Sequence, residues 1–270
     1  TKAAWSVLDC LNLWYWDGWQ QEDNDQISHD LDPLTRLPVP TDSARSIDDA
    51  LILAFLRDDE ETLRRCPNHG LLPERWQKMP LAERQKIALL TLQHLLKASD
   101  GKNSHVLLLV EPEMAILLYY LAARLLPRCI RDKCSFSTYE PARGRIQTTI
   151  AASWFYDPAN AKTPEQARNI EVLNTLELET LEIEKDAAAN QTKDKQADKV
   201  ARLYATTILH RLTKDGSWGR VDKMLAAFDA AGPSNSNELV KLVQATSLAD
   251  RLLSEKEPVD PKEWRGQKLI

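Results

Sequence analysis

The chain has 270 residues, of which 43% are hydrophobic and 28% charged, a balance typical of globular proteins with enough apolar side chains to fill a core. Its formal net charge of −5 excludes a general electrostatic attraction to nucleic acid or to an anionic membrane surface. Only 8 glycines are present, which favours helices because glycine costs about 1 kcal/mol relative to alanine inside a helix.

The cysteines and the apolar stretches indicate a cytoplasmic protein. Four cysteines scattered over a chain of this length do not make a disulfide framework, and we expect free thiols in a reducing cytosol at Cys10, Cys66, Cys129 and Cys134. Charged residues and a proline interrupt the most apolar stretch, residues 106–126, so we expect no transmembrane helix. Because the chain begins at Thr1 without Met or a signal peptide, we expect the numbering to start inside a longer or processed polypeptide.

Residues 1–100 are predicted to form an N-terminal helical region. Its first helix, over residues 3–16, is amphipathic and ends in an aromatic run that contains Trp14 and Trp16. Aromatic side chains bury large areas, so we expect this helix to pack against another part of the protein.

An acidic, proline-rich linker separates that helix from the rest of the N-terminal region. It covers residues 20–42, and its acidic residues do not follow the spacing of a calcium-binding loop. Two longer helices are expected after it, because apolar residues recur at helical spacing over residues 46–65 and again over residues 81–97.

Residues 101–160 are predicted to form a small α/β centre. The continuous apolar run at residues 106–110 has the length of a buried strand. Pro112 suits the first turn of a helix, and residues 114–126 continue as a strongly apolar helix.

Two further strands are expected in this centre. Residues 134–139 and 145–155 have strand character, and a turn at residues 141–144 separates them. We therefore predict that these two strands pair as a hairpin.

Residues 161–270 are predicted to form a C-terminal helical region. Its helices are expected at residues 163–181, 198–212, 218–231 and 237–254. The predicted fold class is therefore α+β and predominantly α-helical, with a small strand-helix-strand-hairpin centre that helices flank on both sides.

The sequence contains no recognised catalytic motif. A phosphate-binding loop, a dinucleotide-binding fingerprint and paired metal-ligand spacings of Cys or His are all absent from it. Glu111 and Glu113 could act as a catalytic carboxylate pair, but carboxylates at this position also stabilise the start of a helix through its dipole. No catalytic residue, cofactor or metal is predicted.

A local excess of basic residues surrounds the predicted strands, although the whole chain is acidic. The basic residues of this rim are Arg124, Arg128, Arg131, Lys133, Arg143 and Arg145. Such a rim could meet an acidic partner protein or a nucleotide. Aromatic residues are not interleaved with it as they are in single-strand binders, so we consider nucleic acid an unlikely partner.

Three segments of the predicted centre form a recognisable series. They are LLLVEPEM from Leu107 to Met114, an apolar helix that ends in RLLP at Pro127, and CSFSTYEP from Cys134 to Pro141. Together, residues 107–141 resemble the bacterial GTPase-associated proteins, multi-domain chains of predicted biological-conflict systems. The resemblance covers about a seventh of the chain and implies a non-enzymatic adaptor or sensor module that works beside a GTPase and effector proteins.

We interpret the chain as a protein-interaction module that contacts other proteins, a GTPase or an effector among them, as part of a longer chain or complex and without a membrane partner. The residues expected to contact a partner are Trp14, Trp16, Arg128, Arg131, Arg143 and Arg145. Two alternatives stay open. One is an enzyme, a hydrolase or nucleotide-handling protein, that uses Glu111, Glu113 and the basic rim; the other is a structural subunit of a larger assembly.

Overall fold

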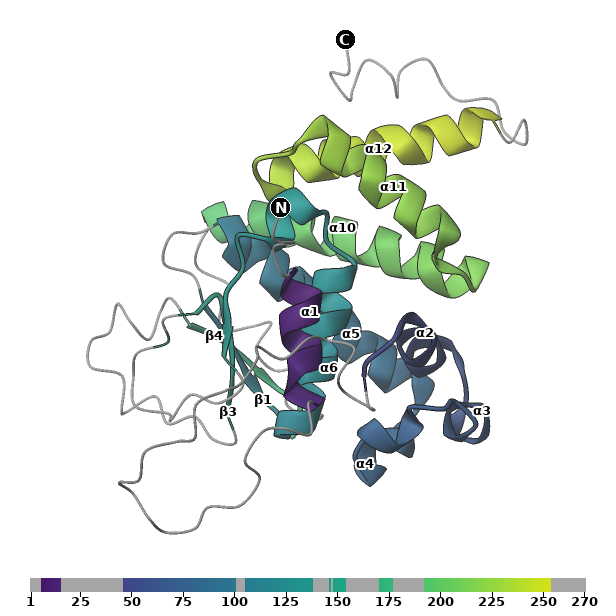
Figure 1. Cartoon of the computed structure of the whole chain (residues 1–270). Coiled ribbons are helices and arrows are strands. Elements are labelled where there is room, and N and C mark those ends of the chain that lie inside the picture. The colour runs from purple at the N-terminus through teal and green to yellow at the C-terminus, as the bar shows by residue number, and fades with distance from the viewer. Residues whose placement is uncertain are drawn as a thin grey trace, which may run out of the picture.

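The computed structural model describes residues 6–15, 46–100, 105–137, 146, 148–153, 170–176 and 192–253. Within these ranges the protein is mostly helical and contains one small sheet (Figure 1), which confirms the predicted predominance of helices around a strand-containing centre. No helix of the described ranges is long and apolar enough to cross a membrane.

The sheet is parallel throughout its described strands, in the order β2-β3-β1-β4. The strands are β1 (His105–Leu109), β2 (Phe136–Ser137), β3 (Ile150–Ser153) and β4 (Ile170–Asn174). The central strand β1 pairs with β3 on one side and with β4 on the other, with Val106 opposite Ile150 and His105 opposite Ile170.

The predicted hairpin is wrong, because β2 and β3 run parallel, with Phe136 opposite Ile150. Residues 138–149 separate the two strands, and a connection of about a dozen residues is long enough to return a chain to a parallel neighbour. Strand β3 also reads Ile-Ala-Ala-Ser with all four side chains buried, which is the continuous burial typical of a parallel strand rather than the alternation of a hairpin.

The predicted helix at residues 163–181 is also wrong where the structure describes it, because β4 lies inside this range. The residues Ile170 and Val172 pack on one face of the sheet with Leu107, whereas Leu173 joins the larger core on the other face. This alternation is that of a strand, and the β-branched Ile170 and Val172 favour it. The rest of the predicted helix lies outside the described residues.

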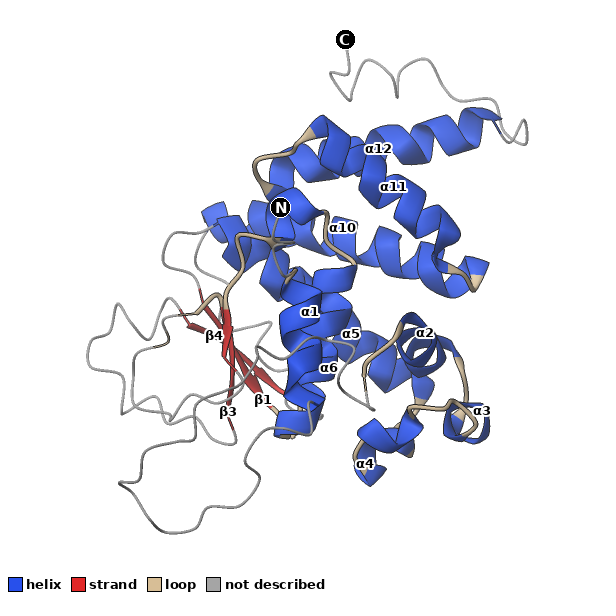
Figure 2. Ribbon diagram, viewed as in Figure 1, coloured by secondary structure: helices blue, strands red, loops and turns tan. Residues whose placement is uncertain are grey.

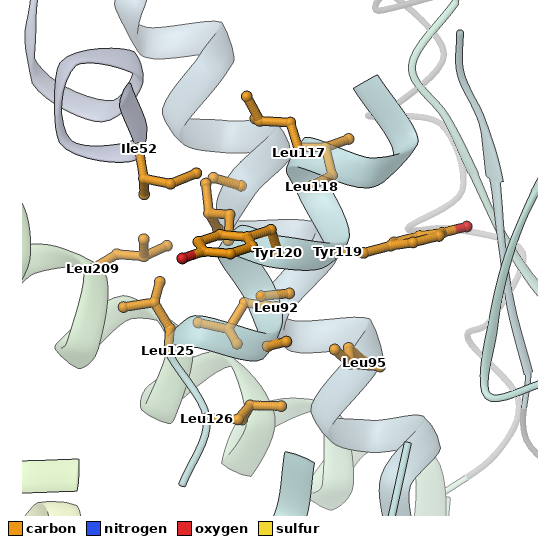
Figure 3. Packing of buried hydrophobic residues seen from close by; sticks show 14 of the residues in the cluster. Ile52, Leu92, Leu95, Leu117, Leu118, Tyr119, Tyr120, Leu125, Leu126 and Leu209 are labelled. Carbon is orange, nitrogen blue, oxygen red and sulfur yellow. The ribbon is translucent and has the colours of Figure 1, made fainter. Parts of the chain in front are cut away.

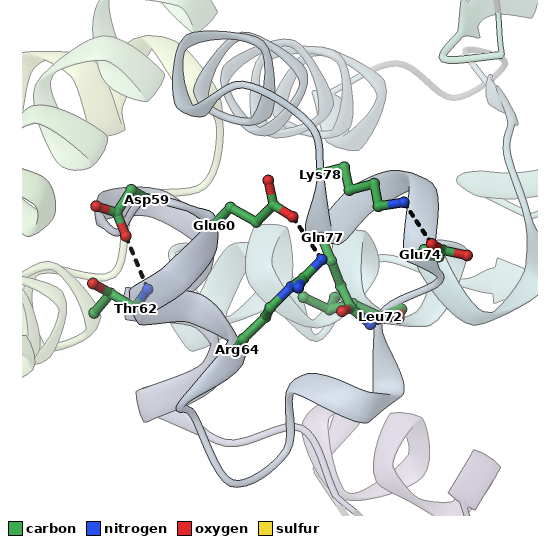
Figure 4. Close-up of polar contacts among 8 residues, drawn as sticks. All are labelled: Asp59, Glu60, Thr62, Arg64, Leu72, Glu74, Gln77 and Lys78. Atoms are coloured by element: carbon green, nitrogen blue, oxygen red, sulfur yellow. Dashed lines mark hydrogen bonds and ion pairs between the residues drawn. The ribbon is translucent and has the colours of Figure 1, made fainter.

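Several short helices and one long helix precede the sheet along the chain. They are α1 (Val7–Asn12), η1 (Leu13–Tyr15), α2 (Asp49–Arg57), α3 (Glu60–Arg64), η3 (His69–Leu71), α4 (Glu74–Gln77) and α5 (Leu81–Asp100). The single helix expected over residues 46–65 is split between α2 and α3. Asp59 causes the break, because its side chain accepts a hydrogen bond of 2.9 Å from the backbone N–H of Thr62 and so caps a new helix (Figure 4).

The described helices that follow β1 match the predicted ranges 114–126, 218–231 and 237–254 to within two residues, but one begins six residues before the predicted start at residue 198, and the one at residues 128–131 was not predicted. They are α6 (Pro112–Arg124), the short α7 (Arg128–Arg131), α10 (Thr192–Asp215), α11 (Trp218–Ala231) and α12 (Ser236–Leu253). Gly232 ends α11 in the left-handed conformation at φ 63°, a backbone geometry that glycine adopts without steric cost.

One hydrophobic core joins the three regions that the sequence suggested, with α6 in its middle. Every residue of α6 from position 114 to 123 is buried. In Figure 3, Tyr119 points toward the strands and Tyr120 points the other way, toward Ile52 of α2 and Leu209 of α10. Figure 2 shows the described helices on one side of the sheet, and a smaller apolar cluster with Leu107 and Ala151 lies on its opposite face.

Candidate functional site

The carboxyl edge of the sheet is the first place to look for a site, because open parallel sheets bind their ligands there. Glu111 follows β1 at this edge and is 17% exposed. Its two carboxylate oxygens accept hydrogen bonds from neighbouring residues of α4: Nη1 of Arg75 at 3.0 Å and Nε1 of Trp76 at 2.9 Å. Both oxygens of this carboxylate therefore already have a donor within the protein.

Arg75 extends this cluster from Glu111 to the end of β4. It also donates to the backbone carbonyl of Thr175, and the Thr175 hydroxyl donates at 2.8 Å to the carbonyl of Leu109 in β1. Thr175 itself is fully buried. The cluster thus fixes the ends of two neighbouring strands against α4.

Glu113, the second member of the predicted carboxylate pair, is exposed in the first turn of α6. There its charge favours the positive end of the helix dipole, which is the structural explanation that the sequence already offered. Glu111 and Glu113 differ in burial and, where contacts are described, do not share a hydrogen-bond donor. The geometry therefore gives the pair no joint acid–base role.

Arg124 of the predicted basic rim is paired rather than available. It is 16% exposed, and its guanidinium donates to the carboxylate of Asp49 from Nε at 3.0 Å and from Nη2 at 2.9 Å. Asp222 lies 2.7 Å from the same Nη2. Burial alone would lower the pKa of Arg124, but the two carboxylates outweigh burial and raise it.

Arg128, Arg131 and Lys133 of the rim precede β2, so they lie toward the amino edge of the sheet and not at its ligand-binding edge. Arg128 is exposed, as expected for a partner contact. Arg131, in contrast, is only 8% exposed, and its Nε lies 3.5 Å from Asp132. Lys133 is exposed and donates at 3.0 Å to the carbonyl of Ser234.

These positions correct the expectation of a continuous basic rim. Arg131 is buried and Arg124 neutralised, so neither adds a free charge to the surface. The remaining predicted contacts, Arg143 and Arg145, lie outside the described residues. Arg128 is thus the predicted arginine contact that the structure places at the surface.

Trp14, the other type of predicted contact, lies in η1 and is 41% exposed. Among the described residues, the exposed large hydrophobic side chains are Trp14 and Leu203 of α10, at 41% and 39%. Trp16 lies outside the described residues.

Helix α1, which leads directly into η1 and Trp14, is anchored at both ends. A capping box between Ser6 and Asp9 starts α1, and Leu11 is buried in the core. The side-chain oxygen of Asn12 accepts a hydrogen bond of 3.0 Å from the backbone N–H of Ile47. The exposed indole is therefore displayed by an ordered element and not by a free end.

The sequence did not predict a second cluster of charged side chains, which lies between β4 and the helices α5 and α10. Glu171 of β4 lies between two residues of α5, with its Oε2 at 2.5 Å from Nδ1 of His94 and its Oε1 bonded to Nζ of Lys97. Lys97 also lies 2.9 Å from Asp198 of α10. Glu171 could not be assigned to this cluster because it lies in a segment whose apolar spacing also fits a helix.

Nucleophilic and metal-binding groups do not converge in the described part of the chain. No group of three or more His, Cys, Asp or Glu side chains within it could hold a metal ion. The four cysteines are free thiols, and burial raises the pKa of Cys134 to about 12. Such a thiol stays protonated at neutral pH, so it is a poor nucleophile.

Comparison with known proteins adds no assignment: the chain matches no protein-family model, no curated protein and no solved structure.

Proposed function

We propose that the chain is a non-enzymatic protein-interaction module, an adaptor that binds other proteins in the cytoplasm. The observation that carries this proposal is the exposed indole of Trp14 on an anchored helix. Tryptophan is strongly enriched among the residues that dominate binding energy at protein interfaces, and a rigid support lowers the entropy cost of binding.

The resemblance of residues 107–141 to bacterial GTPase-associated proteins supports a particular class of partner. It suggests a GTPase or an effector protein of a conflict or defence system. Exposed Arg128 gives the surface a positive group that could steer an acidic partner.

The enzyme alternative receives less support from the same contacts. Glu111 is engaged by Arg75 and Trp76, and Arg124 by two carboxylates. Groups held in this way position secondary structure, and a role in proton transfer would require them to leave their partners.

Co-purification from the native host tests the adaptor proposal. The tagged 270-residue chain is compared with Trp14→Ala, and with Leu203→Ala as the matched control, since Leu203 is exposed to a similar extent on a different helix. We expect a defined protein to be retained by the unaltered chain and by Leu203→Ala, and to be reduced at least about tenfold by Trp14→Ala. Arg128→Glu should weaken the same complex in a salt-dependent way.

Two results would count against this function. One is an identical set of retained proteins with Trp14→Ala, and the other is no retained protein with any variant. Light scattering on the purified chain tests the alternative that the protein is a structural subunit of a larger assembly. If the chain self-associates and Trp14→Ala abolishes the self-association, the indole contacts a second copy of the chain.

A further inference from the structure

Strand β4 differs from its neighbours in how it is held. Among the described strands it pairs with β1 alone, at the end of the sheet order. All side chains of β3 are buried and so are those of β1 after its first residue, whereas in β4 only Leu173 is buried. Apolar burial therefore contributes less to the docking of β4 than to that of the central strands.

Charged contacts with helices α5 and α10 hold β4 in place where its apolar burial is small. Glu171 projects from β4 between His94 and Lys97 of α5, and Asp198 of α10 holds Lys97 from its other side at 2.9 Å. We call these four residues the latch. Burial alone would raise the pKa of Glu171, but the hydrogen bonds and charges of His94 and Lys97 outweigh burial and lower it to about 2.

The far end of β4 is fastened by polar contacts as well. The N–H and the hydroxyl of Thr175 both donate to the carbonyl of Leu109, at 3.1 and 2.8 Å, and Arg75 donates to the carbonyl of Thr175. Forming a partly exposed ion pair removes water from both charged groups, which costs free energy. The net contribution of such a pair to stability is therefore smaller than that of an equal area of apolar contact.

We propose that β4 opens as a unit while the rest of the core stays folded, and that the latch of Glu171, Lys97, His94 and Asp198 sets how often it opens. Elements with little apolar burial open at lower free energy than the global unfolding of a protein. Opening uncovers the backbone edge of β1, and a free strand edge pairs readily with an extended segment of another chain. The opening itself needs no partner, so it does not depend on the adaptor function.

The backbone of β1 supplies an internal control for this opening. The amides of Val106 and Val110 donate toward the β3 side, to Thr149 and Ser153 at 2.9 and 3.1 Å. Since successive residues of a strand point their amides to opposite sides, those of Leu107 and Leu109 face β4. One strand thus carries amides that β4 protects beside amides that it does not protect.

Residue-resolved amide hydrogen exchange by NMR on the full chain tests the proposal. We expect the amides of β4 and those of Leu107 and Leu109 to exchange at one common rate, at least about tenfold faster than those of Val106 and Val110. Lys97→Met should raise that common rate by a further factor of about ten.

Two further variants make the test specific to the latch. Glu171→Gln, which keeps the shape of the side chain, should act in the same direction as Lys97→Met. Lys78→Met, which removes the exposed pair with Glu74, should change none of these rates. The proposal is overturned if Leu107 and Leu109 exchange as slowly as Val106 and Val110 in the unaltered chain, a comparison that requires no variant to fold. It is also overturned if Lys97→Met and Glu171→Gln leave the exchange of the β4, Leu107 and Leu109 amides unchanged.

Discussion

The guanidinium of Arg124 lies over the indole ring of Trp218, with Cζ 4.3 Å from the ring centroid. The indole N–H donates at 2.9 Å to the backbone carbonyl of Asp49, whose carboxylate in turn accepts from Arg124. One arginine of α6 thus connects α2, which precedes the sheet along the chain, with α11, which follows it. This arrangement helps the helices that precede the sheet along the chain and those that follow it to share one core.

Replacing Arg124 should therefore destabilise the whole fold. We expect Arg124→Met to lower the free energy of unfolding by about 2–3 kcal/mol, because it leaves two carboxylates without their cation and removes the stacking on Trp218. Arg124→Lys keeps the charge but loses the two-pronged contact, so about 1–2 kcal/mol should be lost. Urea unfolding followed by circular dichroism measures both values.

Arg64→Met is the control for Arg124, because Arg64 forms an exposed pair with Glu60 one helical turn away (Figure 4). It should cost no more than about 0.5 kcal/mol. If the Arg64 and Arg124 variants lose equal amounts of unfolding free energy, the contacts of Arg124 with Trp218 and Asp49 stabilise the fold no more than an exposed ion pair does.

Glu111→Gln separates a structural role of this carboxylate from a catalytic one. Gln cannot accept two charge-assisted hydrogen bonds, so the contacts to Trp76 and Arg75 weaken and the free energy of unfolding should fall by about 1–3 kcal/mol. Glu113→Gln, on the exposed first turn of the same helix, should cost at most about 0.5 kcal/mol. An unchanged urea midpoint for Glu111→Gln would instead favour the enzyme alternative.

Local signals explain which elements could be predicted. Pro112 opens α6 and Pro127 follows its end, while Gly232 closes α11, so the bounds of both helices could be predicted from single residues. Asp59 carries such a signal too, but it lies between apolar residues at helical spacing, and the periodicity concealed the break between α2 and α3.

Contacts between distant residues explain what could not be predicted. The strand β4 reads Ile-Glu-Val-Leu-Asn, a run too short to distinguish a helix from a strand until its pairing with β1 is known. Arginines are mostly exposed, yet Arg84 is buried and donates to the carbonyls of Met79 and Phe55, and Arg124 pairs with a residue 75 positions away. An estimate of surface charge from the sequence alone therefore includes arginines, such as Arg124, whose charge is paired inside the fold.

Two glycines in the same conformation allow the cost of a close contact to be measured. Gly216 and Gly232 both follow a helix at φ 63°, but an added Cβ would clash with the guanidinium of Arg57 at Gly216 and would meet nothing within 4 Å at Gly232. Gly232→Ala should cost about 1 kcal/mol for the left-handed backbone alone. Gly216→Ala should cost about 0.5–1 kcal/mol more, because Arg57 must leave the carboxyl end of α10.

The same pair of substitutions in an Arg57→Ala background checks this explanation. In urea unfolding, Gly216→Ala and Gly232→Ala should then lower the free energy of unfolding by equal amounts, since the clash with Arg57 has been removed. A difference that persists without Arg57 would mean that backbone strain differs between the two helix ends.

The latch also predicts a dependence of stability on pH. The pKa of Glu171 falls from an ordinary value of 4.5 to about 2 in the folded protein. A lowered carboxyl pKa stabilises the fold at pH values above the unfolded pKa, and this contribution is lost as the pH falls through the folded pKa. Glu171 should thus supply about 3 kcal/mol at neutral pH that disappears between about pH 5 and pH 2.

Comparison with Glu171→Gln isolates this contribution from that of the other carboxylates, since Gln does not titrate in either state. The difference in unfolding free energy between the unaltered chain and the variant, measured by urea titration at successive pH values, should be constant above about pH 5.5 and shrink steadily below it. A difference that stays constant down to about pH 3 would mean that His94 and Lys97 do not favour the charged form of Glu171 over its protonated form. In that case the charged contacts could not be what holds β4 against α5.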